Sequence, residues 1–408
     1  MMKIIQINAV YPNLSTGNLC YEIEKRLVSE GHECITIYGQ KNGDIDTAGD
    51  KCFNSGFDRR MHAFLSRLIG IQGHFSKIAT IKMIRFIKEY NPDLVCLGNL
   101  HANFVNIPAL MRFFQNKKIP VIVSLFDCFF FTGKCTHYID IECQKWRTGC
   151  CDCPKLKGDN KSWLFDCSKL LWNEKKNYFS ALDKLGVICP TNWVANDASQ
   201  SLLKCADVIK RIYYWTDTDL YKPHDASYLR EKLNIKDKKV ILGVSAIWTE
   251  HKGIHIFMEL SKIISKDYVI VMVGRVDNEE YPPNENIIFV GSVMNKEELS
   301  DYYSMADIYM NPSIAETFGL TYVEAMASGT PSIVYDSLAA RELVGTDGRL
   351  GMTVEKNDAE LYYKGIQDIV KRGKAAYSSL CRSNAVKLFN KESVLSEYIS
   401  FIEEIVAK

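Results

Sequence analysis

Two glutamates separated by seven residues mark the segment Asn311 to Pro331 as the part of the chain best suited to chemistry. Glu316 precedes a predicted helix that follows a strand directly, and Glu324 lies inside that helix. Gly319 permits a close backbone approach at the helix start. A helix N-terminus offers backbone N–H groups and a partial positive charge, which suit a pyrophosphate. Carboxylates suit the hydroxyl pairs of sugars, because each oxygen accepts a charge-assisted hydrogen bond.

Lys252 stands in a second informative segment, Gly243 to Gly253, where a predicted strand ends and a loop leads into a helix. A lysine is a mobile point charge suited to phosphate. Read alone, Lys-Gly is typical of an exposed loop, so this interpretation depends on the glutamates downstream. Gly274 and Arg275 follow another predicted strand, where a glycine is also common in an ordinary turn.

The chain has 14 cysteines, and six of them lie within 26 positions. A final C-x-x-C is a common half of a zinc site, and four thiolates would form a closed structural site with no open position for catalysis. Packed thiols or two disulfides are the alternatives for the same residues. The candidate zinc ligands are Cys135, Cys143, Cys150 and Cys153.

Short apolar runs alternate with helical spacing along the chain, which predicts parallel sheets covered on both faces. A turn-rich passage, Thr216 to His224, suggests a junction between two doubly wound domains, 1–215 and 216–390. Such domains normally bind ligands at the carboxyl ends of their strands, in a cleft between lobes. The amphipathic helix 391–408 then needs a surface to cover. Predicted strands in the first domain are Lys3 to Asn8, Glu33 to Tyr38, Leu94 to Leu97, Val121 to Leu125, Val187 to Cys189 and Ile212 to Tyr214.

The charge balance and the apolar runs restrict the partners of the chain. With 50 basic and 49 acidic residues, the chain has almost no net charge, so long-range electrostatic attraction to nucleic acid is not expected. No stretch approaches the ~20 apolar residues that span a bilayer, and the N-terminus reads as a strand, so we expect a cytoplasmic protein. Residues 59–88 mix basic and apolar side chains. They could rest on an anionic membrane surface, or they could cover the core with their charges solvated.

The segment around Glu316 and Glu324 resembles the E-x7-E signature of family-4 retaining glycosyltransferases, whose GT-B fold has two Rossmann-like domains facing each other across a cleft. The resemblance implies that Glu316 binds the donor sugar, Glu324 the ribose and Lys252 the diphosphate. It also implies that the C-terminal helix packs back on the first domain. Further donor contacts implied by the resemblance fall at Gly17, Ser245, Gly274, Arg275 and the backbone of Thr317, Phe318, Gly319 and Leu320.

The segment Pro120 to Pro154 resembles a subgroup that builds bacterial surface polysaccharides, in which a strand ending in His-Asp leads to a Thr-Gly turn and spaced cysteines. Asp127 matches this pattern and becomes a catalytic candidate beside Glu316 and Lys252, and Thr132 and Gly133 match as well. Position 126 is Phe instead of His. That change leaves three readings: a different donor, a substitute such as His101 or His137, or impaired catalysis. Asn99 and His101, after a predicted strand, are acceptor-side candidates.

Together these features predict a retaining transferase that moves a sugar from a nucleoside diphosphate sugar to a glycan or lipid-linked acceptor. The resemblance implies no catalytic metal, which leaves structural zinc as the one metal considered. Two alternatives stay open. One is a GT-B enzyme of another reaction, such as a nucleotide-sugar epimerase or a phosphorylase, and the other is a non-catalytic binding subunit.

Overall fold

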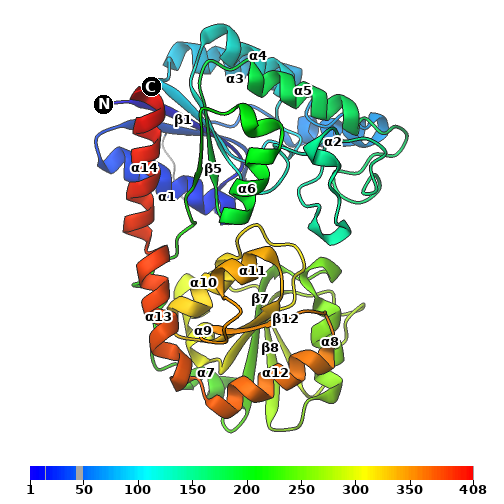
Figure 1. Cartoon of the computed structure of the whole chain (residues 1–408), viewed down its shortest axis with the longest axis vertical. Helices are drawn as coiled ribbons and strands as arrows, with labels where there is room; N and C mark the ends of the chain where they lie inside the picture. Colours follow the sequence, from blue (N-terminus) through cyan, green and yellow to red (C-terminus); the bar gives the residue numbers. More distant parts are fainter. Residues whose placement is uncertain (14, 43–48, 408) are drawn as a thin grey trace. The chain divides into compact units, whose positions relative to one another are not determined.

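The computed structural model describes residues 1–13, 15–42 and 49–407, and the chain forms two compact units (Figure 1). The first unit contains Met1–Ile212 together with the C-terminal segment from Leu395 onward. The second unit contains Tyr213–Val394. Each unit has its own parallel sheet and its own buried core.

Six parallel strands form the sheet of the first unit in the described part of the chain, in the order β2-β1-β3-β4-β5-β6. The residues of β3, β4 and β5 are all buried, as expected for short runs of valine, isoleucine and leucine covered on both faces. The strands are β1 (Lys3–Pro12), β2 (Glu33–Asn42), β3 (Leu94–Leu97), β4 (Val121–Ser124), β5 (Leu185–Cys189) and β6 (Val208–Arg211).

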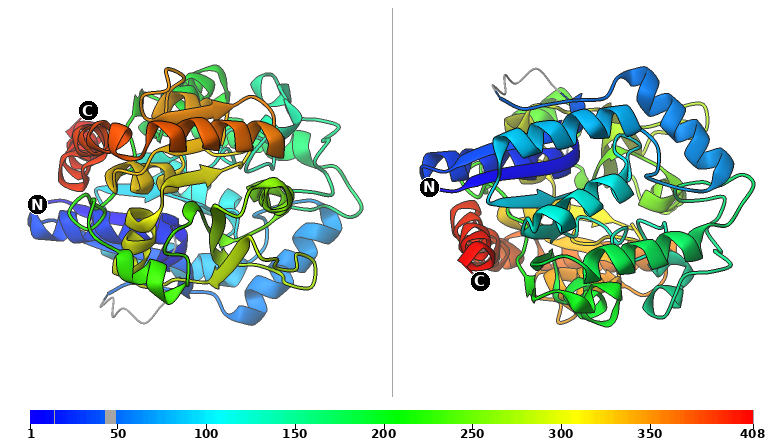
Figure 2. Two further views of the ribbon diagram at one scale, coloured as in Figure 1. Left: turned by 90° about the horizontal axis from the view of Figure 1, so that it is seen from below. Right: turned by 90° about the horizontal axis from the view of Figure 1, so that it is seen from above.

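Helices cover the first sheet, and the C-terminal helix α14 (Lys391–Ala407) packs on it beside α1 (Figures 1 and 2). The Tyr398 hydroxyl bonds the Ser124 hydroxyl of β4 at 2.7 Å, and a Cβ at Gly186 of β5 would lie 2.9 Å from Ile405. The last part of the chain therefore belongs to the first core. The other helices of this unit are α1 (Ser15–Ser29), α2 (Gly56–Ile69), α3 (Lys77–Tyr90), α4 (Ile107–Lys117), α5 (Ser168–Ser180) and α6 (Asn192–Gln200).

The second sheet also consists of six parallel strands within the described residues, in the order β12-β11-β10-β7-β8-β9. The strands are β7 (Lys239–Ile247), β8 (Tyr268–Arg275), β9 (Ile287–Gly291), β10 (Ile308–Asn311), β11 (Ser332–Tyr335) and β12 (Gly351–Val354). The helices are α7 (Ser227–Lys232), α8 (Ile254–Ile263), α9 (Lys296–Met305), α10 (Leu320–Ala327), α11 (Leu338–Leu343), α12 (Ala359–Arg372) and α13 (Ala375–Phe389).

Both sheets reverse their winding direction at a central strand. The chain leaves β1 toward β2 and returns on the other side with β3, and it leaves β7 toward β8 and β9 and returns with β10. In open parallel sheets, ligands bind outside the carboxyl ends of the strands at such switch points. Each unit therefore has one switch point, at the carboxyl ends of its central strands, that favours a ligand site.

The predicted strand Ile212 to Tyr214 is wrong. The last strand of the first sheet is β6, which ends at Arg211 and pairs with β5. All four residues of β6 are only half buried, because β6 lies at the edge of the sheet. Its sequence, VIKR, lacks the apolar run that marks a central strand.

Candidate active site

Lys252 and Glu316 form an ion pair at the switch point of the second sheet. Lys252 lies in the 3-10 turn η4 (Glu250–Lys252) after β7, and Glu316 lies in the loop between β10 and α10. Nζ donates to Oε1 across 2.7 Å, and the two side chains are 39% and 16% exposed. Because β7 and β10 are neighbours, their loops meet. Because the Lys252 side chain is more than a third exposed, its ammonium can leave the pair for a ligand.

Helix α10 begins beside this pair, at Gly319. Gly319 is the N-cap residue with φ +98°, a conformation that favours glycine, and a Cβ there would lie 2.6 Å from the Tyr322 ring. Having no side chain, Gly319 cannot accept hydrogen bonds from the first amides of the helix as Ser or Asp would. The start of α10 thus supplies the amides and the partial positive charge that suit an anion.

Glu324 lies in the second half of α10 and is held by a tyrosine of α9. The Tyr303 hydroxyl donates to Oε2 at 2.7 Å. Burial raises the pKa of the Glu324 carboxyl to about 7, although the Tyr303 hydrogen bond and the charge of Lys296 act in the opposite direction. The protonation state of Glu324 therefore changes near neutral pH. Sequence reasoning missed Tyr303, because a tyrosine in a helix is ordinarily a core residue.

The remaining donor-side candidates lie at the ends of β7 and β8 or at the entry to α10. The Ser245 hydroxyl donates to the Ile247 carbonyl at 2.9 Å. Gly274 has φ +122°, and a Cβ there would clash with the Ser245 carbonyl, so strand packing alone requires this glycine. Arg275 follows it with an exposed side chain. The Phe318 ring is buried against Tyr214 and Phe389, and Thr317 is buried as well, whereas Leu320 is partly exposed.

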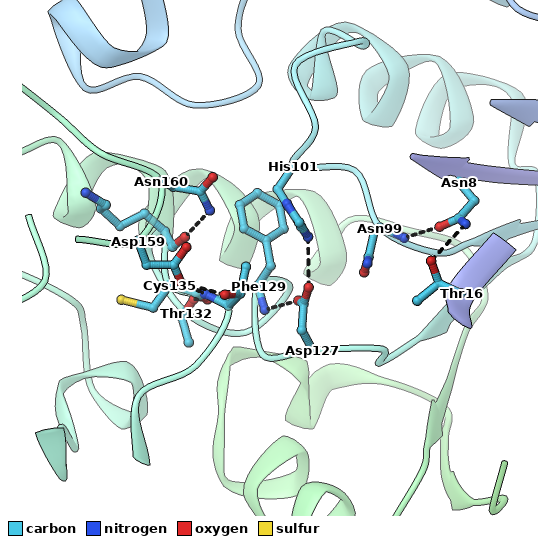
Figure 3. A network of polar contacts seen from close by, with 12 residues as sticks. Asn8, Thr16, Asn99, His101, Asp127, Phe129, Thr132, Cys135, Asp159 and Asn160 are labelled. Carbon is cyan, nitrogen blue, oxygen red and sulfur yellow. Dashed lines mark hydrogen bonds and ion pairs between the residues drawn. The ribbon is translucent and has the colours of Figure 1, made fainter. Parts of the chain in front are cut away.

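At the switch point of the first sheet, the Asn8 side chain of β1 links the loop after β3 to the start of α1 (Figure 3). The Asn99 N–H donates to Asn8 Oδ1 at 2.8 Å, and Asn8 Nδ2 reaches the Thr16 hydroxyl at 3.4 Å. Gly17 follows Thr16, and a Cβ at Gly17 would lie 3.1 Å from the Val10 carbonyl. Gly17 therefore permits the close approach of α1 to β1.

His101 and Asp127 point toward one another from the loops after β3 and β4 (Figure 3). His101 Nε2 lies 2.8 Å from Asp127 Oδ2, and Asp127 Oδ1 accepts the Phe129 N–H at 2.8 Å. Burial lowers the pKa of His101, but the Asp127 carboxylate more than compensates, so the net pKa is raised. Burial raises the pKa of Asp127, and His101 with the Phe129 amide outweighs it, so the net pKa is lowered. Both shifts favour the charged pair.

Lys175 of α5 binds the loop that follows Asp127. It was missed in the sequence, because a lysine on an amphipathic helix normally indicates a solvated face. The side chain is buried, and its ammonium lies 3.4 Å from the centroid of the Phe129 ring. Nζ donates to the carbonyls of Phe129, Thr132 and Gly133 at 2.6, 3.1 and 3.3 Å. Burial lowers the Lys175 pKa to about 7. The lysine therefore fixes the loop that carries Asp127.

The structure does not support the predicted zinc site. Across residues 1–13, 15–42 and 49–407, no group of three or more His, Cys, Asp or Glu side chains is arranged to hold a metal ion. The described cysteines are free thiols, so the alternative of two disulfides is also not observed. Cys135 hydrogen-bonds Cys153, and Cys150 accepts the Gly133 N–H at 3.2 Å, so these thiols are satisfied by one another and by the backbone. Cys143 is partly buried.

Comparison with known proteins shows the family of this chain. Residues 225–385 match the family model described as Glycosyl transferases group 1. The alpha-monoglucosyldiacylglycerol synthase of Acholeplasma laidlawii is 30% identical over 296 residues, which cover 68% of this chain and 68% of that protein. The chain belongs to the group 1 glycosyl transferases. Family-4 glycosyltransferases of this group are retaining enzymes that are generally independent of metals.

One further relative and one solved structure match this chain over almost its whole length. The putative colanic acid biosynthesis glycosyl transferase WcaC of Escherichia coli K12 is 22% identical over 99% of this chain and 100% of that protein. The structure of Anabaena Alr3699/HepE in complex with UDP and glucose aligns with TM-score 0.69 at 16% identity, over 99% of this chain and 100% of that one. This likeness shows the GT-B fold. Several other curated relatives are matched over only 37% to 64% of their own length.

The thiol pair predicts one unusually reactive cysteine in this glycosyltransferase. The hydrogen bond from Cys135 lowers the pKa of Cys153 against the effect of burial, so more of Cys153 is thiolate at pH 7 than of an ordinary cysteine. Cys135→Ala removes the donor and should slow alkylation of Cys153 by iodoacetamide at pH 7 roughly fivefold or more. Alkylation is followed by peptide mass spectrometry across pH.

Cys135→Ser is the matched control, because a serine hydroxyl still donates and most of the Cys153 rate should remain. Identical pH midpoints in wild type and Cys135→Ala would contradict the assigned pair. So would elemental analysis that finds zinc near one equivalent.

Proposed function

We propose that this glycosyltransferase moves a sugar from a nucleoside diphosphate sugar to a glycan or lipid-linked acceptor during synthesis of a bacterial surface polysaccharide. The Lys252–Glu316 pair beside the start of α10 carries the proposal, because it combines a cation, a carboxylate and helix amides at one switch point. The names of the relatives support the acceptor class: one is assigned to colanic acid biosynthesis, and another is a glucosyldiacylglycerol synthase.

In the proposed complex, the donor breaks the ion pair between Lys252 and Glu316 and binds both side chains. The Lys252 ammonium turns to the diphosphate, and the Glu316 carboxylate accepts hydrogen bonds from hydroxyls of the sugar. The amides at Gly319 and Leu320 contact the phosphate nearest the sugar. Glu324, further along the same helix, accepts the ribose hydroxyls. Because Phe318 and Thr317 are buried, their part in binding comes from the backbone.

The proposed reaction exchanges one bond at the anomeric carbon for another. The bond from that carbon to the phosphate oxygen breaks, and a bond to the acceptor oxygen forms on the same face of the sugar. The acceptor proton passes to the departing phosphate oxygen, so a nucleoside diphosphate leaves. Lys252 and the start of α10 stabilise the negative charge that grows on this leaving group, which is where charge stabilisation accelerates the reaction most.

We assign His101 and Asp127 to the sugar or the acceptor. In the subgroup with the cysteine-rich segment, a histidine precedes this aspartate, and here that position is Phe126. His101 reaches Asp127 from the neighbouring loop and supplies an imidazole beside the same carboxylate. The proposal therefore treats His101 as a substitute for the missing histidine. Asn99 lies on the same loop, and we assign it to acceptor contact.

Replacing Glu316 tests the donor site directly. Glu316→Ala removes the carboxylate that grips the sugar and should lower kcat/KM for release of nucleoside diphosphate about 100-fold, or about 2.7 kcal/mol in the transition state. The assay measures nucleotide release over a panel of donors and acceptors. Glu231→Ala, which alters a surface pair with Lys236, should leave the rate unchanged.

A Glu316→Ala rate within threefold of wild type would remove Glu316 from the proposed site. Formation of an epimer or a sugar phosphate without transfer would favour an epimerase or a phosphorylase. Donor binding without nucleotide release under any acceptor would favour a binding subunit.

The raised pKa of Glu324 predicts a pH dependence of donor binding. A carboxyl with a pKa of about 7 becomes neutral below that pH and loses its preference for ribose hydroxyls, so the KM for the donor should rise as pH falls from 8 to 6. Tyr303→Phe removes a hydrogen bond that lowers this pKa, so the same rise should begin at a higher pH. Steady-state kinetics across pH measure both curves.

Tyr309→Phe is the control, because Tyr309 is a buried tyrosine whose hydroxyl bonds Thr321 rather than Glu324. A profile for Tyr303→Phe that coincides with wild type would show that Glu324 does not govern donor binding.

A further inference from the structure

The outer face of α2 leaves three large apolar side chains in solvent. Phe57, Met61 and Phe64 are 74%, 41% and 47% exposed and recur at intervals of four and three residues, so they form one stripe. His62 and Ser66 lie on the opposite face and are buried, and His62 bonds the Ser76 hydroxyl at 2.9 Å. The inner face therefore belongs to the core, and the outer stripe does not.

The loop that carries Trp163, Leu164 and Phe165 continues this stripe. It follows the cysteine-rich segment, residues 128–153. The Trp163 ring meets the Phe64 ring edge-on, with the ring centroids 5.9 Å apart, and the backbone N–H of Trp163 donates to the Arg67 carbonyl at 2.6 Å. A Cβ at Gly70 would clash with the Phe165 carbonyl, so the loop lies directly against the end of α2. Trp163, Leu164 and Phe165 are nevertheless 44%, 63% and 57% exposed. We call the joint surface the apolar patch: Phe57, Met61, Phe64, Trp163, Leu164 and Phe165.

Basic side chains predominate around the apolar patch. Two exposed arginines lie on α2 itself, and three exposed lysines lie in or beside the loop. The acids here are held by internal hydrogen bonds: Asp58 accepts the Ser76 hydroxyl, and Asp166 accepts the backbone N–H groups of Cys153 and Ser168. Because the whole chain has a net charge of only +1, this excess is local. The basic residues are Arg60, Arg67, Lys157, Lys161 and Lys169.

We propose that the apolar patch inserts into the headgroup region of an anionic lipid bilayer, with the surrounding arginines and lysines contacting lipid phosphates. A helix that lies flat with exposed aromatic and aliphatic side chains between basic residues fits a membrane interface, where tryptophan is also favoured. A protein partner would need an acidic rim around an apolar surface of its own, whereas an anionic bilayer supplies both over any area. The patch shares α2 with the range 59–88 suggested by the sequence, and it adds the loop residues Trp163, Leu164 and Phe165.

This inference does not rest on the sugar transfer reaction, and vesicle binding tests it separately. The full chain is sedimented with vesicles of phosphatidylcholine alone, or of equal parts of phosphatidylcholine and phosphatidylglycerol. Wild type should bind the anionic vesicles at least about tenfold more tightly, and added salt should weaken that binding. The double variant Leu164→Glu, Phe165→Glu should lose at least about tenfold in partitioning.

Leu361→Glu is the matched control, since Leu361 is 43% exposed on α12 of the second unit and should bind as wild type does. The double variant should also keep its circular dichroism and its activity on a water-soluble acceptor, which separates lost docking from lost folding or catalysis. Equal binding of wild type to both kinds of vesicle, or undiminished binding of the double variant, would overturn the proposal. So would a concentration-dependent dimer that the double variant abolishes, because the patch would then join two copies of the chain.

Discussion

In the proposed function, a doubly charged diphosphate has to be held without a large loss of stability in the empty site. The proposal assigns this task to an ion pair of the second unit that a ligand can open. Lys252 and Glu316 neutralise each other at 2.7 Å until a ligand competes for both. Because Lys252 is the more exposed partner, its ammonium can move from the carboxylate to a ligand. The start of α10 adds positive potential that needs no counter-ion, since it comes from backbone amides. The same residues can therefore serve an empty site and an occupied one.

The first unit solves a different problem, which is to keep a charged histidine–aspartate pair rigid in a largely apolar setting. Asp127 is buried, and an unpaired carboxylate there would be costly. His101 and the Phe129 amide satisfy its two oxygens, and the buried ammonium of Lys175 ties the same loop through three carbonyls. The cysteine-rich segment lies next to this loop, because the Gly133 amide bonds Cys150. Its thiols are placed to brace the loop rather than to hold a metal.

The sequence predicts those parts of the molecule that depend on local pattern. The two parallel sheets were predicted correctly because their central strands are continuous apolar runs. The edge strand β6 was missed because VIKR is half buried and mixed in character. The His101–Asp127 contact was not predicted, because it depends on β3 and β4 being neighbours. Lys175 and Tyr303 were missed because burial decides their role, and residue type alone does not indicate burial.

Amide hydrogen exchange with and without a nucleoside diphosphate tests the central claim most directly. If the diphosphate is held at the start of α10, exchange of the amides between Thr317 and Tyr322 and around Lys252 should slow markedly at saturating ligand. Peptides from α12, on another part of the same unit, should exchange unchanged. Saturable binding of the nucleotide with no protection between Thr317 and Tyr322 would contradict the account.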